Sequence, residues 1–511
     1  MIALTVAQIA EIVGGELADI SAEEAAQRTV TGTVEFDSRA LGAGGLFLAL
    51  PGARSDGHDF AKGAIEAGAA VVLAARPVGV PAIVVPPAVA TDADAGVLEH
   101  DVDGAGAAVL AALAKLAAAV AAELVAGGLT IVGVTGSSGK TSTKDLIAAV
   151  LRPLGEVVAP PGSFNNELGH PWTVLRATED TDYLVLEMSA RHPGNIAALA
   201  SIAPPSIAVV LNVGTAHIGE FGSREIIAAT KGELVEAVAS SGVAILNADD
   251  PMVAAMAQRT AARVVRVGQS ESADIRAVDV DLDELARPRF TLVSPAGEAQ
   301  VQLAVHGEHQ VGNALSAAAV ALECGATLEQ VAAAQGAAGP ASRHRMEVHT
   351  RTDGVTVVND AYNANPDSMK AGLQALAVMA RSGDCRRSWA VLGEMAELGD
   401  SSITEHDRVG RLAVRLDISR LVVVGTGRPM NAMHHGAVME GSWGSESTMV
   451  DDADAALELL RAELAPGDVV LVKASNSAGL GALAEALLAA EPTMRPRDEA
   501  EEERGNRGGT A

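Results

Sequence analysis

The sequence has few of the residues that would suit a nucleic-acid-binding or disulfide-stabilised protein. Only two of its 511 residues are cysteine, and 65 acidic residues outnumber 37 basic ones, which gives a formal net charge of -28. Two cysteines, Cys324 and Cys385, cannot build a disulfide framework, which favours a reducing compartment. The acidic excess repels phosphodiester backbones, so it argues against a nucleic-acid surface. A phosphate ligand must therefore be held by a local site.

Long apolar runs are scarce as well. The longest, Ala105 to Val125, is mostly alanine and carries Lys115 and Glu123, so it falls short of a membrane span and predicts a helix of a soluble domain. The first residues, MIALTVAQIAEIVGG, lack a basic stretch and are typical of a short amphipathic helix, not of a signal peptide. These absences predict a cytoplasmic protein without membrane insertion.

The length of the chain exceeds what a single hydrophobic core supports, and the pattern of strands and helices predicts an α/β fold with three domains. Short apolar strands alternate with helical segments throughout, which is typical of parallel sheets covered by helices. Residues 275 to 305 are more extended and suit a hairpin at a sheet edge. We predict domains at residues 1–100, 101–341 and 342–490, the last resembling a dinucleotide-binding (Rossmann-like) fold, and a disordered tail at 491–511.

The segment GLTIVGVTGSSGKTSTKDLIAAVL predicts a strand, a glycine-serine turn and a helix. In this turn Gly136 and Gly139 let backbone N–H groups surround a polyphosphate, Lys140 supplies a positive charge, and Thr141 offers a hydroxyl to magnesium. The loop is shorter than the usual Walker pattern, because Val134 stands where the first glycine is expected. We predict nucleotide binding by Thr135, Gly136, Ser137, Ser138, Gly139, Lys140, Thr141 and Ser142.

This phosphate loop, TGSSGKTS, resembles those of the Mur ligases and of their relative folylpolyglutamate synthetase. The segment SFNNELGHPWTVL, from Ser163 to Leu175, resembles the Asn-Asn-x-x-Gly-x-Pro segment of the Mur ligases that add D-alanyl-D-alanine. The resemblance implies that Asn165 and Asn166 bind substrate.

Three further residues are implied by the same resemblance. Glu187 ends the strand-like run LVLEM, His217 follows the strand-like run IAVVLNV, and Lys231 lies in ATKGELV. A glutamate at a strand end caps a helix about as often as it binds metal, and a lone histidine is seldom a ligand. The resemblance implies that Thr141, Glu187, His217 and a carbamylated Lys231 hold one or two magnesium ions, and that Lys140, Glu187, His217 and Lys231 are catalytic.

The segment FDSRALGAGGLFLALPGARSDGHDF resembles the UDP-sugar-binding domain at the amino terminus of this family, which implies that Ser38, Arg39, Asp56 and His58 bind substrate. An arginine can form paired bonds to a diphosphate oxygen or a carbonyl, which suits that role. Taken alone, DSR and DGHDF are ordinary loop sequences.

The remaining matches concern ATP and the acceptor. GEHQVGN, SRHRMEV and NDAYNANPDSM resemble family segments around ATP and imply roles for His309, Asn313, Arg345, Asp360 and Asn363. Asn365, Lys473 and Ser475 are implied to bind substrate, although VLVKASNSAGL has Ala474 and Asn476 where the family favours Lys-Gly-Ser-Arg. We expect a hinge near Ala341 to Arg345, because the third domain must rotate onto the second to exclude water.

The resemblance covers residues 30 to 490 and implies a monomeric ATP-dependent ligase. Its reaction would add D-alanyl-D-alanine to a UDP-N-acetylmuramoyl-tripeptide through an acyl phosphate, in peptidoglycan precursor synthesis. A ligase that adds diaminopimelate or lysine commonly has an Asp-Asn-Pro-Arg-like motif, which this sequence lacks. A folate ligase would lack the DSR and DGHDF segments, and a P-loop ATPase without ligase activity would not need His217 and Lys231 beside a UDP-sugar-binding domain.

Overall fold

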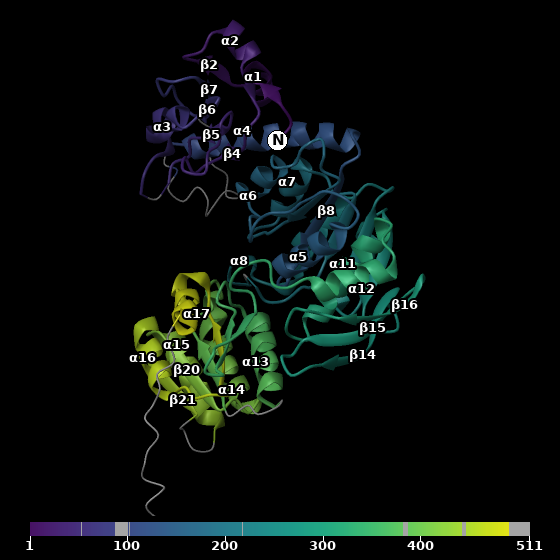
Figure 1. The fold of residues 1–511 in the computed structure, drawn as a ribbon, viewed down its shortest axis with the longest axis vertical. Coiled ribbons are helices and arrows are strands. Elements are labelled where there is room, and N and C mark those ends of the chain that lie inside the picture. The colour runs from purple at the N-terminus through teal and green to yellow at the C-terminus, as the bar shows by residue number, and fades with distance from the viewer. Residues whose placement is uncertain are drawn as a thin grey trace, which may run out of the picture.

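The computed structural model describes residues 1–52, 54–86, 101, 103–216, 218–381, 387–441 and 446–489. Three large sheets, each covered by helices, follow one another along the chain from purple to yellow in Figure 1. This arrangement confirms the predicted α/β fold. Cys385, His217 and the predicted disordered tail lie outside the described residues. Cys324 is half-buried, and its burial raises the pKa of the thiol to about 11.

The first large sheet has the strand order β2-β7-β6-β5-β4, and only β2 runs antiparallel to its neighbour. Its strands are β2 (Glu16–Ala18), β4 (Val34–Glu35), β5 (Leu46–Leu48), β6 (Val71–Ala74) and β7 (Ala82–Val84). A separate antiparallel pair joins β1 (Leu4–Thr5) to β3 (Thr29–Val30). The helices are α1 (Val6–Val13), α2 (Ala22–Gln27) and α3 (Ala61–Glu66). The predicted amino-terminal helix is present as α1, and short strands alternate with helices as predicted.

The central sheet has nine strands in the order β16-β15-β14-β13-β12-β11-β8-β10-β9. The strands are β8 (Thr130–Thr135), β9 (Val157–Val158), β10 (Tyr183–Glu187), β11 (Ile207–Val210), β12 (Val243–Asn247), β13 (Arg263–Gly268), β14 (Ile275–Leu282), β15 (Pro288–Ser294) and β16 (Gly297–Gln302). Strands β8 to β14 are parallel to their neighbours in this group. Strands β14, β15 and β16 form an antiparallel edge, as predicted for residues 275 to 305.

Alternate side chains of the central strands enter two different cores. On β8, Ile131 belongs to the core shared with α4 and the first domain, whereas Val132 belongs to the core under α5 and α11. The helices are α4 (Ala105–Ala126), α5 (Lys140–Leu151), α6 (Gly169–Val174), α7 (Asn195–Ile202), α8 (Ile218–Phe221), α9 (Arg224–Glu236), α10 (Pro251–Ala254), α11 (Gln310–Glu323) and α12 (Leu328–Ala337). Burial on both faces explains why these strands are continuous apolar runs.

Helix α4 is, among the described residues, long and apolar enough to cross a membrane by length and composition alone. In this structure it packs against α1, α6 and α7, and Leu113, Leu116 and Val120 are fully buried. Figure 1 places it along the junction of the first and central sheets. It therefore behaves as a core helix that joins two domains.

The third sheet has the strand order β17-β18-β22-β19-β20-β21, with β17 antiparallel to the others. The strands are β17 (Glu347–Thr350), β18 (Thr356–Asn359), β19 (Ser388–Leu392), β20 (Arg420–Val424), β21 (Ser447–Val450) and β22 (Val469–Lys473). The helices are α13 (Pro366–Arg381), α14 (Ser402–Arg415), α15 (Arg428–Glu440), α16 (Ala453–Glu463) and α17 (Leu480–Ala489).

A side chain caps the first turn of α13. Helix α13 begins at Pro366, because the Asn365 side chain accepts a hydrogen bond from the Ser368 N–H at 2.9 Å and caps the first turn. Helix α14 begins at Ser402. The carboxyl ends of the parallel strands in the central and third sheets face each other, which is where ligands bind in open α/β sheets.

Candidate active site

A cavity of about 980 Å³ lies between the central and third sheets. Its walls come from the loops after β8, β10 and β11 on one side and from those after β18, β19 and β22 on the other. The residues predicted from the sequence that line it are Ser137, Ser138, Gly139, Lys140, Thr141, Ser142, Asn165, Asn166, Glu187, His309, Asn313, Arg345, Asp360, Asn363, Asn365, Lys473 and Ser475. The cavity therefore collects predicted residues that are more than 300 positions apart in the chain.

The phosphate loop joins β8 to α5 and turns at Gly139, whose φ of +81° is a left-handed conformation that favours glycine. A Cβ at this position would come within 2.7 Å of Asn313 Oδ1, so α11 packs directly against the turn. The Lys140 ammonium folds back and donates to the Gly136 carbonyl at 2.9 Å. Thr135, which ends β8, and Gly136, which begins the turn, do not line the cavity.

Asn212, at the end of β11, holds the loop from outside. Its Oδ1 accepts hydrogen bonds from the Ser137 and Ser138 N–H groups, both at 3.0 Å, and its Nδ2 donates to the Ser138 carbonyl at 3.1 Å. Two of the amides that the sequence suggested for phosphate binding are therefore engaged by a side chain. Because an amide both donates and accepts, asparagine can make all three bonds.

Glu187 is a buried carboxylate at the end of β10, with 1% of its surface exposed. Its two oxygens accept from the Thr141 hydroxyl at 2.9 Å and from Asn165 Nδ2 at 2.6 Å. Ser189 fixes Asn165 in turn by donating to it at 3.0 Å. A buried anion held by neutral donors is stabilised when a cation binds beside it. The pair of Thr141 and Glu187 has the oxygen donors that magnesium prefers.

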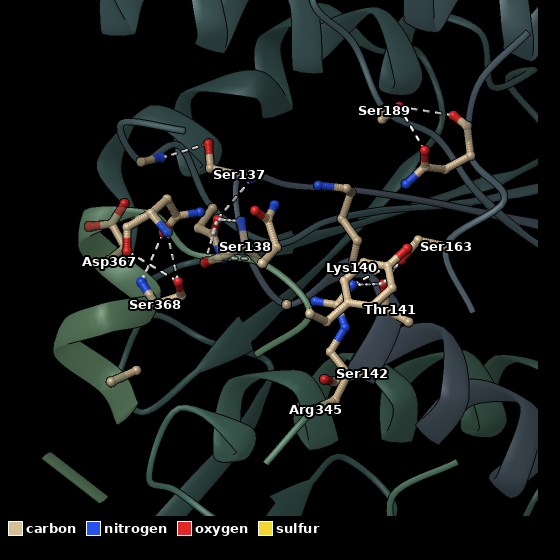
Figure 2. Close-up of a pocket in the computed structure, with 18 of the residues that line it drawn as sticks. Ser137, Ser138, Lys140, Thr141, Ser142, Ser163, Ser189, Arg345, Asp367 and Ser368 are labelled. Carbon is tan, nitrogen blue, oxygen red and sulfur yellow. Dashed lines mark hydrogen bonds between the residues drawn. The ribbon is translucent and has the colours of Figure 1, made fainter. Parts of the chain in front are cut away.

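Arg345 reaches from the third domain into the phosphate loop. Its Nη2 donates to Thr141 Oγ1 at 3.1 Å and to Ser163 Oγ at 2.9 Å, and Figure 2 shows these groups gathered beside Lys140. The guanidinium stacks 4.1 Å above the Tyr362 ring. On either side of Arg345, His344 and Met346 have φ of +58° and +50°. These strained residues turn the backbone of the predicted hinge so that Arg345 points into the cavity.

Lys231 lies on α9 and does not line the cavity. Burial lowers the pKa of its ammonium well below the usual range, and the nearby Lys140 lowers it further. Among the described residues no carboxylate forms an ion pair with it. A lysine in this setting is readily uncharged.

The third domain contributes a buried ion pair to the opposite wall. Lys473 Nζ donates to Asp360 Oδ2 at 2.6 Å and to the Asn363 carbonyl at 3.0 Å, and Asp360 Oδ1 accepts from the Met346 N–H at 3.1 Å. Ser475 Oγ accepts from the Ala396 N–H at 2.9 Å, which ties the loop after β22 to the loop after β19. These bonds fix the wall that faces the phosphate loop.

The predicted residues of the first domain lie away from this cavity. Arg39 is 89% exposed at its side chain and pairs with Asp37, which lowers the pKa of that carboxyl to about 2. Ser38 lies between them in the same turn. His58 is buried, where its Nδ1 lies 2.6 Å from Asp56 Oδ1 and its Nε2 accepts from the Ala75 N–H at 3.1 Å. His58 therefore braces the loop rather than offering a free ring nitrogen.

An aromatic cluster joins the first domain to the cavity wall. Phe36 contacts Phe164 and Trp172, and the Trp172 indole N–H donates to the Val34 carbonyl at 2.8 Å. Phe164 lies between Ser163 and Asn165 in sequence, so this cluster fixes the substrate loop to the first domain. Only eleven aromatic residues occur in the chain, which makes three at one junction notable as a structural anchor.

Several residues of the site were not identified from the sequence. They include polar groups whose partners lie far away in the chain: Ser163, Ser189, Arg191, Asn212, Asp367 and Glu397. Arg191 and Glu397 form an ion pair at 3.0 Å between the central and third domains. Asn212 lies in the segment that also contains His217. Its position shortly after a strand, where polar residues often line a site, was the signal that could have identified it.

Family models cover most of the chain. Residues 32–121 match the model described as "Mur ligase family, catalytic domain", residues 134–321 match "Mur ligase middle domain", and residues 344–476 match "Mur ligase, glutamate ligase domain".

Relatives and solved structures agree with these matches. The chain is 74% identical to a UDP-N-acetylmuramoyl-tripeptide–D-alanyl-D-alanine ligase of Mycobacterium tuberculosis, over 96% of this chain and 98% of that one. It is 33% identical to the Escherichia coli protein of the same name, over 95% and 99% of the two chains. A crystal structure of MurF from Acinetobacter baumannii superimposes with a TM-score of 0.79 at 28% identity, covering 96% and 99%. The structure of MurF ligase from Thermotoga maritima in complex with ADP gives a TM-score of 0.71 at 28% identity, covering 89% and 97%.

Proposed function

This chain belongs to the Mur ligase family, and on that premise we propose that it joins D-alanyl-D-alanine to UDP-N-acetylmuramoyl-tripeptide, using ATP, in peptidoglycan precursor synthesis. It is an ATP-dependent ligase that forms a carbon–nitrogen bond. The observation that carries the proposal is the single cavity in which the phosphate loop, Glu187 and the third-domain wall meet. Such a cavity can bring a nucleotide, a carboxylate and an amine together.

The chemistry requires an activated carboxylate. A carboxylate does not react with an amine unaided, because oxide would have to leave, so the γ-phosphoryl group of ATP is first transferred to it as an acyl phosphate. The amine of the dipeptide then attacks the carbonyl carbon, and phosphate departs. Lys140 and Arg345 would neutralise the phosphates, and their positions beside the phosphate loop and Thr141 support this role.

The polar residues of α11 suit the base and the sugar of ATP. Asn313 packs against the glycine turn, and its Nδ2 donates to Gln310 Oε1 at 2.8 Å. His309 also lines the cavity at the start of this helix. We assign His309 and Asn313 to nucleotide binding, with Asp360 and Asn363 closing over it from the third domain.

Magnesium fits the oxygen donors of Thr141 and Glu187, which would hold it together with phosphate oxygens. When bound, it supplies positive charge to the phosphoryl group in transfer. From the family resemblance we also assign His217 and a carbamylated Lys231 to metal binding. The burial of the Glu187 carboxylate beside neutral hydrogen-bond donors supports the assignment of magnesium to Thr141 and Glu187.

Lys231 is the residue that we propose to be carbamylated. Carbon dioxide reacts with an uncharged amine, and burial and Lys140 both lower the pKa of Lys231 and so favour the uncharged form. The resulting carbamate would be an anion close to the Lys140 cation. Labelling with ¹³C-bicarbonate tests this assignment: a carbamate signal that Lys231→Gln removes supports it, and the same signal in both proteins contradicts it.

The donor and acceptor would enter from different domains. We assign the UDP-sugar to the first domain, with Ser38, Arg39, Asp56 and His58 in the loops that present it, and the tripeptide to Asn165 and Asn166. The acceptor belongs to the third-domain wall at Asn365, Lys473 and Ser475. We propose domain boundaries near residues 100 and 341, a hinge at residues 341 to 345, a monomeric enzyme and a cytoplasmic location.

The experiment that tests the function is a reconstituted ligation. Purified protein is incubated with magnesium, ATP, UDP-N-acetylmuramoyl-tripeptide and D-alanyl-D-alanine, and phosphate release and product mass are measured while each component is omitted in turn. Phosphate release and a pentapeptide mass that both need the dipeptide are expected. A requirement for a different amino acid as acceptor would contradict the proposed acceptor and leave an ATP-dependent Mur ligase.

A further inference from the structure

The four residues from Asn212 to Thr215 touch two domains at once. They follow β11 in the central sheet, and they lie between the phosphate loop and the first turn of α13. Figure 2 shows that turn, with Asp367 and Ser368, facing the loop that carries Ser137 and Ser138. The proposed function assigns no role to this segment or to Asp367.

On the central side the segment is bonded to the phosphate loop. Asn212 accepts from the N–H groups of Ser137 and Ser138, and the Gly214 N–H donates to Ser137 Oγ at 2.9 Å. The first half of the phosphate loop therefore cannot shift unless this segment shifts as well.

On the other side the segment is bonded to the third domain. The Thr215 N–H donates to Asp367 Oδ2 at 3.1 Å, and a Cβ at Gly214 would overlap the same oxygen. Asp367 is the second residue of α13, where the helix dipole stabilises a carboxylate. The Asp367 carboxylate thus fills the space that a Cβ at position 214 would occupy, so this contact requires glycine there.

We propose that Asp367 is a positioning residue, which links docking of the third domain to the geometry of the phosphate loop through Gly214, Thr215 and Ser137. When the third domain docks, the carboxylate fixes the segment from 212 to 215, and that segment fixes the loop. This inference rests on the proposed function only in supposing that the cavity is catalytic. Closure that assembles a site in this way raises the rate of the bound complex more than it raises nucleotide affinity.

Three variants test the link. Asp367→Ala removes the acceptor, Asp367→Asn keeps an oxygen that accepts from Thr215, and Asp454→Ala removes an exposed first-turn carboxylate from α16, which does not line the cavity. We expect Asp367→Ala to lower kcat about tenfold, the effect of losing one hydrogen bond to a charged group, while ADP affinity stays within about twofold. Asp367→Asn should retain most of the activity, and Asp454→Ala should match the unmodified protein.

Other results would overturn the proposal. Unchanged kcat in Asp367→Ala, or loss of ADP affinity in proportion to kcat, would show that Asp367 does not act through docking. Equal loss in Asp367→Asn would show that the acceptor oxygen is not what matters. If the unmodified protein forms no pentapeptide, the proposed function fails, and the link is then judged by small-angle scattering: ADP should compact the unmodified protein and Asp367→Asn but not Asp367→Ala.

A double-mutant cycle tests the contact directly. Gly214→Ala should displace Asp367 and lower kcat, since its Cβ takes the place of the carboxylate oxygen. In the Asp367→Ala background the same change should lower kcat little further, because no carboxylate remains to be displaced. Fully additive losses would contradict a shared mechanism.

Discussion

Glu187 is a single residue whose proposed role concerns function and not stability. Its carboxylate is buried and held by Thr141 and Asn165, which are neutral. Glu187→Gln keeps an acceptor for Asn165 and can donate to Thr141, while it removes a buried charge. We expect kcat to fall by about 100-fold or more, whereas the melting temperature stays equal or rises.

Steady-state kinetics and thermal unfolding of the same preparation check this prediction. Asn165→Ala serves as the partner variant, because it leaves the Glu187 charge buried with one hydrogen-bond donor fewer. That variant should lower stability as well as activity. Parallel losses of stability and activity in Glu187→Gln would show that the carboxylate supports the fold.

His170 is fully buried on α6, where the backbone of Leu199 and Glu187 lies close to its ring. Burial lowers its pKa from 6.5 to about 4. Between these two values the unfolded chain binds a proton that the folded protein does not, so the free energy of unfolding falls as the pH falls through that window. The slope from this residue is at most about 1.4 kcal/mol per pH unit.

Chemical denaturation from about pH 7 to about pH 5 measures this slope. His170→Leu should flatten the dependence by the part that His170 contributes, whatever its effect on absolute stability. An unchanged slope in the variant would show that other groups cause the pH dependence.

At the scale of elements, the phosphate loop depends on a glycine for two separate reasons. Gly139 has a left-handed φ and no room for a Cβ beside Asn313, whereas Gly162 has a similar φ of +70° and open space around it. Alanine at either position pays about the same backbone penalty, on the order of 1 kcal/mol. Gly139→Ala must also displace the Asn313 side chain, which packs against the loop.

We therefore expect Gly139→Ala to reduce ADP affinity by at least about tenfold, and Gly162→Ala to reduce stability slightly with ADP affinity preserved. Calorimetric titration with ADP compares the two. Equal affinities in both variants would show that the space beside Asn313 does not control the loop.

The same elements show what a sequence can and cannot predict here. The strand, turn and helix from Thr130 to Leu151 follow from local patterns, because β-branched residues, glycines and helical spacing act over short distances. The edge hairpin at residues 275 to 305 followed from the same kind of pattern. Asn212 and Asp367 escaped prediction because their partners come from loops of other elements, which only the tertiary fold brings near. The capping bond from the Ser368 N–H to the Asn365 side chain is likewise a contact that spacing alone does not show.

At the scale of the whole molecule, residues of the central and third domains contact each other around the cavity. Arg191 and Glu397 form an ion pair across the gap at 3.0 Å, and Gly219 and Gly399 bring two backbones into contact nearby. Because both charged side chains are partly exposed, the pair is screened and contributes modestly to stability. The ion pair should instead affect the fraction of molecules in which the two domains are docked.

A charge-exchange series checks this expectation. Arg191→Glu and Glu397→Arg should each reduce the compaction caused by ADP, since each places like charges opposite one another. The double variant should recover it, and small-angle scattering measures all four proteins. Compaction that is equal in all four would show that the pair plays no part in docking.

The aromatic junction gives the molecule an optical property. Trp172 sits against Phe36 of the first domain and beside the loop of Asn165, with Arg176 over its ring at 4.7 Å. The chain has three tryptophans, and Trp389 is buried in the third domain. With Trp389 and Trp443 changed to phenylalanine, the emission of the remaining indole would report changes at the loop from Ser163 to Asn166, which we propose binds the donor, without any added dye. Because the chain has few aromatic residues, the background fluorescence of such a variant would be low, and changes at this one junction could be followed in real time.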